Sequence, residues 1–182
     1  KGITLHRSLP DASVITGGTA QSRIAGLSLT YDGHLIVVFS QGLAILNRNL
    51  TVDSARFYLL GTGTEKVSNS IAVDENNGIY VATNRTMRKL VWTGSEISDR
   101  ESDGAWSSPY DAPDEIPPVI KFDNGTGSTP TLMGFGSDPD KLVVITDGAK
   151  RMNLVAFWRD QIPDGFVQKP GTASRRIAGQ IP

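Results

Sequence analysis

Groups of short β-type segments separated by turns recur along this chain with a spacing in the forties. The first two groups contain apolar and β-branched segments at 24–30, 35–40, 43–46, 55–60, 70–73, 79–83 and 87–92. The turn after the first segment is Asp32-Gly33 in one group and Asn77-Gly78 in the next, and the second segments begin 44 residues apart, at Leu35 and Ile79. Such a period with four strands per unit is typical of β-propellers, because each small sheet buries its faces only against neighbouring sheets. The sequence therefore predicts an all-β fold, a β-propeller of four-stranded antiparallel blades.

A third group of segments predicts how many blades are present. Its second segment begins at Leu142, 63 residues after Ile79, so this interval holds 19 more residues than the first one. In addition, Arg23-Ile24-Ala25-Gly26 returns as Arg176-Ile177-Ala178-Gly179. We expect a single partial ring over 1–182, about three to four blades, with blades at about 24–66, 67–127 and 128–165 and the start of a further blade at 175–182. A β-sandwich or an irregular meander is the alternative.

Charge and composition exclude several classes of protein. Lys and Arg total 18 and Asp and Glu total 19, and the net charge of -1 gives none of the basic surplus that nucleic-acid and membrane-surface proteins require. There is no cysteine, so disulfides, cysteine-based zinc sites and thiol catalysis are excluded. The apolar runs are far shorter than the roughly 20 residues of a membrane span. We therefore expect no nucleic acid and no membrane among the partners.

Other features bear on location and on the surface. Glycosylation sequons begin at Asn49, Asn84 and Asn124, and we favour a periplasmic or secreted location. Residues 93–118 contain seven acids and four prolines, so we expect a surface excursion in which only 105–107 serves as an outer strand. Because an open fan of blades exposes apolar faces and strand edges, we also expect the remaining blades of the same protein, or other copies, to complete the ring.

The segment Ser70-Ile71-Ala72-Val73-Asp74-Glu75-Asn76-Asn77-Gly78-Ile79-Tyr80-Val81-Ala82-Thr83 resembles blades of the quinoprotein-like and SMP-30-like β-propellers. The resemblance covers roughly 24–158. It implies blades around a central channel, with ligands at one face of the ring. It also implies two kinds of enzyme, a lactonase-like hydrolase that uses a divalent cation and a quinoprotein-like oxidoreductase.

Five polar residues mark the face where a ligand is expected. Ser40, Asn84 and Asp147 each follow the second strand of a unit, and Asn69 and Thr129 lie where the first strand of a unit begins. In propellers these loops share one face, so we expect the five residues to bind a protein, a glycan or a small molecule there. Asp147 and Asn84 are candidate ligands for a divalent cation such as Ca²⁺. Alternatively, the Asn and Asp side chains cap the turns through their own hydrogen bonds.

The function that these patterns favour is a β-propeller binding or scaffold module that presents one loop face to a ligand or partner. The alternatives are a metal-dependent hydrolase and a quinoprotein-like oxidoreductase, and the sequence leaves open whether the protein is an enzyme. The histidines, His6 and His34, show no metal-binding spacing and are expected to be exposed. The glycine-containing loops 61–66 and 125–130 lack the third glycine of a dinucleotide-binding motif and are expected to be turns between blades.

Overall fold

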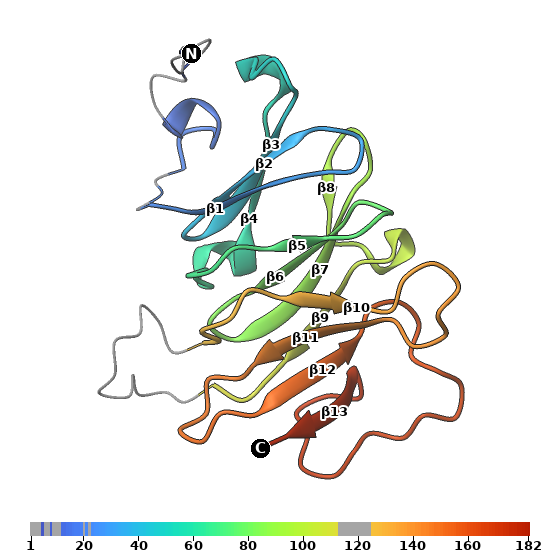
Figure 1. The fold of residues 1–182 in the computed structure, drawn as a ribbon. Coiled ribbons are helices and arrows are strands. Elements are labelled where there is room, and N and C mark those ends of the chain that lie inside the picture. The colour runs from blue at the N-terminus through green and yellow to red at the C-terminus, as the bar shows by residue number, and fades with distance from the viewer. Residues whose placement is uncertain (1–4, 6–7, 9–11, 20, 22, 113–124) are drawn as a thin grey trace, which may run out of the picture.

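Three antiparallel sheets follow one another in the order of the chain (Figure 1). The computed structural model describes residues 5, 8, 12–19, 21, 23–112 and 125–182. In this part of the chain, helical structure is limited to single 3-10 turns at Ala12–Val14, Val52–Ser54, Leu60–Gly63 and Glu101–Asp103. No described helix has the length and apolar character needed to cross a membrane. The all-β prediction is confirmed, and so is the prediction of four-stranded antiparallel sheets.

The first sheet is a four-stranded meander. Its strands are β1 (Ile24–Leu29), β2 (Leu35–Phe39), β3 (Gly42–Leu46) and β4 (Arg56–Leu59), paired in that order. The predicted Asp32-Gly33 turn joins β1 to β2, and Gly33 adopts the positive φ of 88° that the turn requires. Gly42 begins β3 beside Phe57, where a side chain would not fit, because a Cβ would lie 2.5 Å from the ring.

The second sheet has an outer strand that is broken in two. Its strands are β5 (Ala72–Val73), β6 (Gly78–Ala82), β7 (Thr86–Trp92) and β8 (Ile97–Ser98), and β9 (Trp106–Pro109) also pairs with β7. The prediction of a surface excursion over 93–118 is therefore wrong for 97–98 and 105–110, which are buried or pair with β7, whereas 99–104 lie mostly at the surface; an outer strand does form near 105–107. Trp106 and Tyr110 are buried, and Pro109 is tolerated because it stands at the last position of its strand. Residues 113–118 lie outside the described residues.

The third sheet extends to the end of the chain. Its strands are β10 (Thr131–Met133), β11 (Leu142–Thr146), β12 (Leu154–Trp158) and β13 (Ile177–Ile181). The prediction of a further blade starting at 175–182 is wrong, because β13 pairs antiparallel with β12, with Leu154 opposite Ile181. The third sheet thus runs past 165, the predicted end of its unit. The repeated Arg-Ile-Ala-Gly segments occupy different places, since one enters the first strand of a sheet and the other enters a fourth strand.

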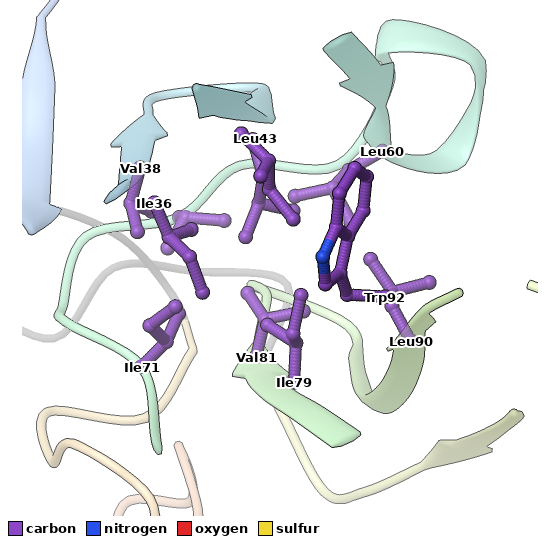
Figure 2. Packing of buried hydrophobic residues seen from close by; sticks show 11 residues of the cluster. Ile36, Val38, Leu43, Leu60, Ile71, Ile79, Val81, Leu90 and Trp92 are labelled. Atoms are coloured by element: carbon purple, nitrogen blue, oxygen red, sulfur yellow. The ribbon is translucent and has the colours of Figure 1, made fainter. Parts of the chain in front are cut away.

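The core consists of two apolar layers, one on each face of the middle sheet. Because successive side chains of a strand point to opposite faces, Ile79 and Val81 of β6 face the first sheet whereas Tyr80 and Ala82 face the third. Figure 2 shows the first layer, in which side chains of the first sheet such as Ile36 meet Ile79, Val81 and Trp92. The second layer joins residues such as Met87 and Trp106 to Val143 and Phe157 of the third sheet. The middle strand β6 is therefore buried on both faces.

The outer faces of the first and third sheets are also apolar. On the first sheet, Ile15 covers part of the face formed by Val37, Phe39, Ala44 and Leu46. Leu27 and Leu29, on the same face of β1, are each 61% exposed. On the third sheet, three apolar side chains that point away from the middle sheet are half exposed or more, namely Met133 at 51%, Leu154 at 50% and Ile181 at 64%, whereas Val144 on the same face is 9% exposed.

Candidate functional site

The five predicted site residues lie at one end of the three sheets. We call this end the linker end; it lies to the left in Figure 1. It consists of the turns that follow the second strand of each sheet, 40–41, 83–85 and 147–153, and of the loops that lead into the next sheet, 64–71 and 125–130. The opposite, hairpin end is defined by the turns 30–34, 74–77 and 134–141 between first and second strands. The loops that the repeat predicted to lie together thus lie at the same end of the three sheets.

At the linker end, the turns that follow β2 and β6 are both hydrogen-bonded to the loop that connects the first sheet to the second. The carbonyl of Ser40 accepts a hydrogen bond from the amide of Val67 at 2.8 Å. The amide of Asn84 donates to the carbonyl of Lys66 at 2.9 Å, and Asn84 Oδ1 accepts from the amide of Lys66, also at 2.9 Å. Because residues 66 and 67 lead from β4 to β5, Ser40 and Asn84 fix the connection between the two sheets.

Tyr110 and Asn69 fasten the loop that leads into the third sheet. The buried Tyr110 hydroxyl donates a hydrogen bond to the carbonyl of Thr83. It also accepts one from the amide of Thr126 at 3.0 Å. Asn69 Nδ2 donates to the carbonyl of Thr126 at 2.8 Å. Gly125 lies against these groups so closely that a Cβ there would be 2.6 Å from Asn84 Cα. Sequence reasoning identified Asn69 but missed Tyr110, which lies in the stretch expected to be a surface excursion.

Asp147 is completely buried, and both of its carboxylate oxygens accept hydrogen bonds. Oδ1 accepts from the amides of Ala149 at 3.1 Å and Asn153 at 2.9 Å, and Oδ2 accepts from the side-chain amide of Asn153. Asn84 Oδ1 is also occupied, as described above. These contacts are those of turn caps, the alternative to cation binding that the sequence left open. Thr129, by contrast, is exposed two residues before β10.

A buried carboxylate that sequence reasoning missed lies just behind the linker end. Glu65 Oε2 accepts from Thr86 Oγ1 at 2.8 Å and from Arg88 Nε at 3.0 Å, and Arg88 Nη2 also pairs with Oε1. Burial raises the pKa of Glu65, but the hydrogen bonds from Arg88 and Thr86 and the charge of Arg88 outweigh this effect and hold the pKa below its ordinary value. Glu65 stands in the Gly-Thr-Gly-Thr loop, where the local sequence gives no sign of a partner on β7.

At the hairpin end, several polar contacts connect adjacent sheets, and two of them are similarly placed. Trp92, the last residue of β7, donates its indole N–H to Asp32 Oδ2 in the β1–β2 turn at 3.1 Å. Arg159, which follows β12, places Nη2 3.6 Å from Asp74 Oδ2 in the β5–β6 turn. In both pairs, an acid in the first turn of one sheet meets a donor at the end of the third strand of the next sheet. We call these two contacts the turn latches.

The second turn latch lies in the core. Arg159 and Asp74 side chains are each 1% exposed, and Asp74 also accepts from the amide of Gly78 at 2.8 Å and from the Tyr80 hydroxyl at 2.7 Å. Burial and the neighbouring Asp74 carboxylate raise the pKa of Tyr80. The Arg159 guanidinium lies over the rings of Tyr80 and Phe135, with centroid distances of 5.7 and 5.3 Å. This buried charge therefore has a partner and two aromatic neighbours.

Two cavities adjoin these elements. The larger, of about 680 Å³, lies between the loop 101–106 and the loop 160–164, and its charged lining residues carry both signs: Lys89, Glu101, Asp160, Asp164 and Arg176. Lys89 Nζ is paired with Asp160 at 2.9 Å, and Arg176 lies over the Trp106 ring at 4.9 Å. The smaller cavity, of about 420 Å³, lies at the linker end beside Asn153 and Gln180.

The acidic residues that follow β7 are held by neighbours. Arg100 pairs with Glu96 and, at 2.8 Å, with Asp103, and Asp99 accepts from the Tyr58 hydroxyl at 2.8 Å. In the described part of the chain, no three His, Cys, Asp or Glu residues are grouped so that they could hold a metal ion. His34 is partly exposed in its turn, with Nδ1 3.1 Å from Asp32 Oδ1. His6 lies outside the described residues.

Comparison with known proteins identifies a relative in an archaeon. The chain is 34% identical over 163 residues to an uncharacterized protein of Archaeoglobus fulgidus, and the match covers 87% of this chain. The chain spans only 30% of the length of that relative. No family model matches the sequence. No solved structure matches it either.

Proposed function

We propose that the chain is part of a β-propeller that acts as a binding or scaffold module, with its ligand at the linker end. The observation that carries this proposal is the order of the three sheets. The first and third have four antiparallel strands in sequence order. The middle one has four strands in the same order and a fifth, β9, that also pairs with β7, and it buries both faces against its neighbours. A radial set of blades requires this arrangement, since a blade has no core of its own.

The turn latches support the same proposal. Trp92 and Arg159 occupy equivalent positions at the ends of β7 and β12, and each meets an acid in the first turn of the preceding sheet, so the second sheet lies against the first much as the third lies against the second. A constant relation between neighbours is expected of blades that repeat around an axis. It is not expected of a β-sandwich, in which two sheets face one another once.

The apolar outer faces support the presence of further sheets as partners. Leu27 on one outer face and Leu154 on the other are 61% and 50% exposed, and groups of exposed apolar side chains are typical of surfaces that contact a partner. In this proposal, other sheets of the same protein or other copies of the chain cover them. The archaeal relative is long enough to contain several more sheets of this size, since the match accounts for 30% of it.

The linker end is the better ligand surface because its loops are held from several sides. Ser40, Asn84 and Tyr110 hold the loops between sheets in place, while the exposed Thr129 and Lys66 side chains point outward from a fixed backbone. A site supported in this way loses little conformational entropy when it binds a ligand.

Amide hydrogen exchange tests the location of the site. The chain is measured alone and with each member of a panel of oligosaccharides, peptides and small metabolites. Slower exchange in 64–71, 83–85 and 147–153 with at least one compound is the expected result. Protection confined to the turns 30–34, 74–77 and 134–141 contradicts the proposed site.

Calorimetric titration with Ca²⁺ and Mn²⁺ tests the metal-dependent hydrolase. We expect no binding heat, because the Asp147 oxygens accept hydrogen bonds from Ala149 and Asn153. Saturable heat that Asp147→Ala removes and Asp103→Ala leaves unchanged would favour the hydrolase instead. Circular dichroism of Asp147→Ala establishes whether it remains folded, and Asn84→Ala, which alters the other candidate ligand, is measured in parallel. No contact among the described residues favours the quinoprotein-like oxidoreductase.

A further inference from the structure

The exposed charged side chains of the linker end are mainly cationic. Four basic residues from three different loops are exposed there, namely Lys66, Arg85, Lys150 and Arg151. None of the four forms a salt bridge with a described residue. Lys66 and Arg85 are neighbours, because Asn84 is hydrogen-bonded to both the amide and the carbonyl of Lys66. The cations therefore extend across loops of successive sheets.

The acids of the linker end do not neutralise these cations. Glu65 is buried and paired with Arg88, and Asp147 is buried within its own turn. Asp111 is exposed, and Oδ2 accepts from Gln180 Nε2 at 3.4 Å. The described surface of this end thus has a positive balance, although the whole chain has a net charge of -1. Charge of one sign gathered on one face attracts ligands of the opposite sign.

The cavity of about 420 Å³ opens beside the cationic turn 147–153. Among its lining residues, Asn153, Thr172 and Gln180 carry amide or hydroxyl groups, and Lys169 is the charged one. Lys169 Nζ lies 5.6 Å from the centroid of the Phe166 ring and makes no salt bridge with a described residue. The cavity is within the size range of small-molecule sites. Its chemistry suits a hydroxylated unit that bears one negative group.

We infer that the linker end binds an acidic polysaccharide, whose sugar carboxylates or sulfates lie along Lys66, Arg85, Lys150 and Arg151 while one acidic sugar occupies the cavity at Lys169. This inference rests on the proposed function, because it names the ligand class for the same end. A chain of charges matches cations that are spread over several loops, whereas a single ion does not. A duplex nucleic acid would reach the cations but is too wide to enter the cavity. Single strands are disfavoured because 40–41, 64–71, 83–85, 125–130 and 147–153 contain no aromatic residue on which bases could stack.

The inference is tested by fluorescence anisotropy with a labelled heparin oligosaccharide and a labelled oligogalacturonate, the first sulfated and the second carrying carboxylates alone. Neutral dextran and a short DNA duplex serve as comparison ligands. Arg85→Glu, Lys150→Glu and Lys169→Glu are each expected to weaken binding of the preferred acidic oligosaccharide by about 3-fold to 10-fold. Arg48→Glu, which reverses an exposed cation after β3 at the hairpin end, is the matched control and is expected to leave binding unchanged.

Each other outcome has a distinct meaning. If neither acidic oligosaccharide binds, the assignment of the ligand class is wrong. The hydrogen-exchange experiment then still tests whether the linker end is the ligand site. Binding that Arg48→Glu weakens and the three linker-end variants do not would overturn the site itself. Equal affinities for heparin and the DNA duplex, with equal effects of Lys169→Glu, would show general attraction of polyanions and overturn the assignment to a polysaccharide.

Discussion

Arg159 of the third sheet and Asp74 of the second lie 3.6 Å apart, Nη2 to Oδ2, with both side chains 1% exposed. Each belongs to a different sheet, and 84 intervening residues separate Asp74 from Arg159 in the chain. The pair therefore ties the packing of two sheets to the correct conformation of two turns. Trp92 and Asp32 do the same one sheet earlier, at 3.1 Å.

Replacing Arg159 by leucine is expected to lower the free energy of unfolding by about 3 kcal/mol, because it leaves a buried carboxylate without its cation. Asp74 keeps its hydrogen bonds from Gly78 and Tyr80, which limits the loss. Urea unfolding measures the change. Arg85→Leu, at an exposed position, is the control and is expected to change stability by less than about 0.5 kcal/mol. Equal losses for both variants would contradict a structural role for the buried pair.

Gly125→Ala is expected to destabilise the protein by about 1 to 3 kcal/mol, because the added methyl group overlaps packed atoms. It would lie 2.6 Å from Asn84 Cα and 2.8 Å from the Thr83 carbonyl oxygen, both backbone atoms. Gly127→Ala, two residues along, has no atom within 4 Å of its Cβ and should be close to neutral. Thermal unfolding of the two variants distinguishes them, and similar melting temperatures would show that the loop at Gly125 is not held as described.

Stability is expected to fall with acid in a way that depends on Glu65. Its pKa in the folded protein is held below the ordinary value of 4.5, so its contribution is fully present above about pH 4.5. As the pH falls below that value, the unfolded chain binds the proton first and the contribution is lost progressively until the folded-state pKa is passed. Urea unfolding from about pH 7 to about pH 3 measures this loss. Glu65→Gln should reduce the pH dependence, and an equal pH dependence in the variant and the wild type would contradict this role of Glu65.

The 182-residue chain is expected to self-associate through its uncovered sheet faces. Leu154→Asp places a charge on the outer face of the third sheet, where the leucine is 50% exposed, and should weaken association by about tenfold with little loss of stability. Val167→Asp changes a side chain that is 77% exposed in the loop before β13 and serves as the control. Sedimentation velocity over a concentration series reports the result. A wild-type chain that stays monomeric throughout would argue against these faces as docking surfaces.

The sequence predicted the strands well wherever hydrophobic pattern and turn residues agreed. The segment expected to begin at Leu142 is β11, and the Asp-Gly and Asn-Gly turns join first to second strands as expected. The outermost strands were predicted less well. Ile177–Ile181 resembles the start of β1 in local sequence, but pairing with β12 fixes its place, and such a long-range contact leaves no local signal.

The candidate site shows the same limit. The repeat register placed Ser40, Asn84 and Asp147 at one end, which the structure confirms. It did not identify their partners, since these are mostly backbone groups of other loops, as with Lys66 for Asn84. Because acids and prolines surround it in sequence, Tyr110 was expected in a surface excursion, and Trp106 in an outer strand of that excursion. Their burial depends on the third sheet, which supplies the opposite wall.

The turn latches bear on how the number of sheets in such a protein can change. Each latch runs one way, with the acceptor on the earlier sheet and the donor on the later one. The second sheet therefore supplies a donor, Trp92, to the sheet before it and an acceptor, Asp74, to the sheet after it. Duplication of a unit such as the second sheet, which has an acid in its first turn and a donor at the end of its third strand, would supply one group for each of its two neighbours.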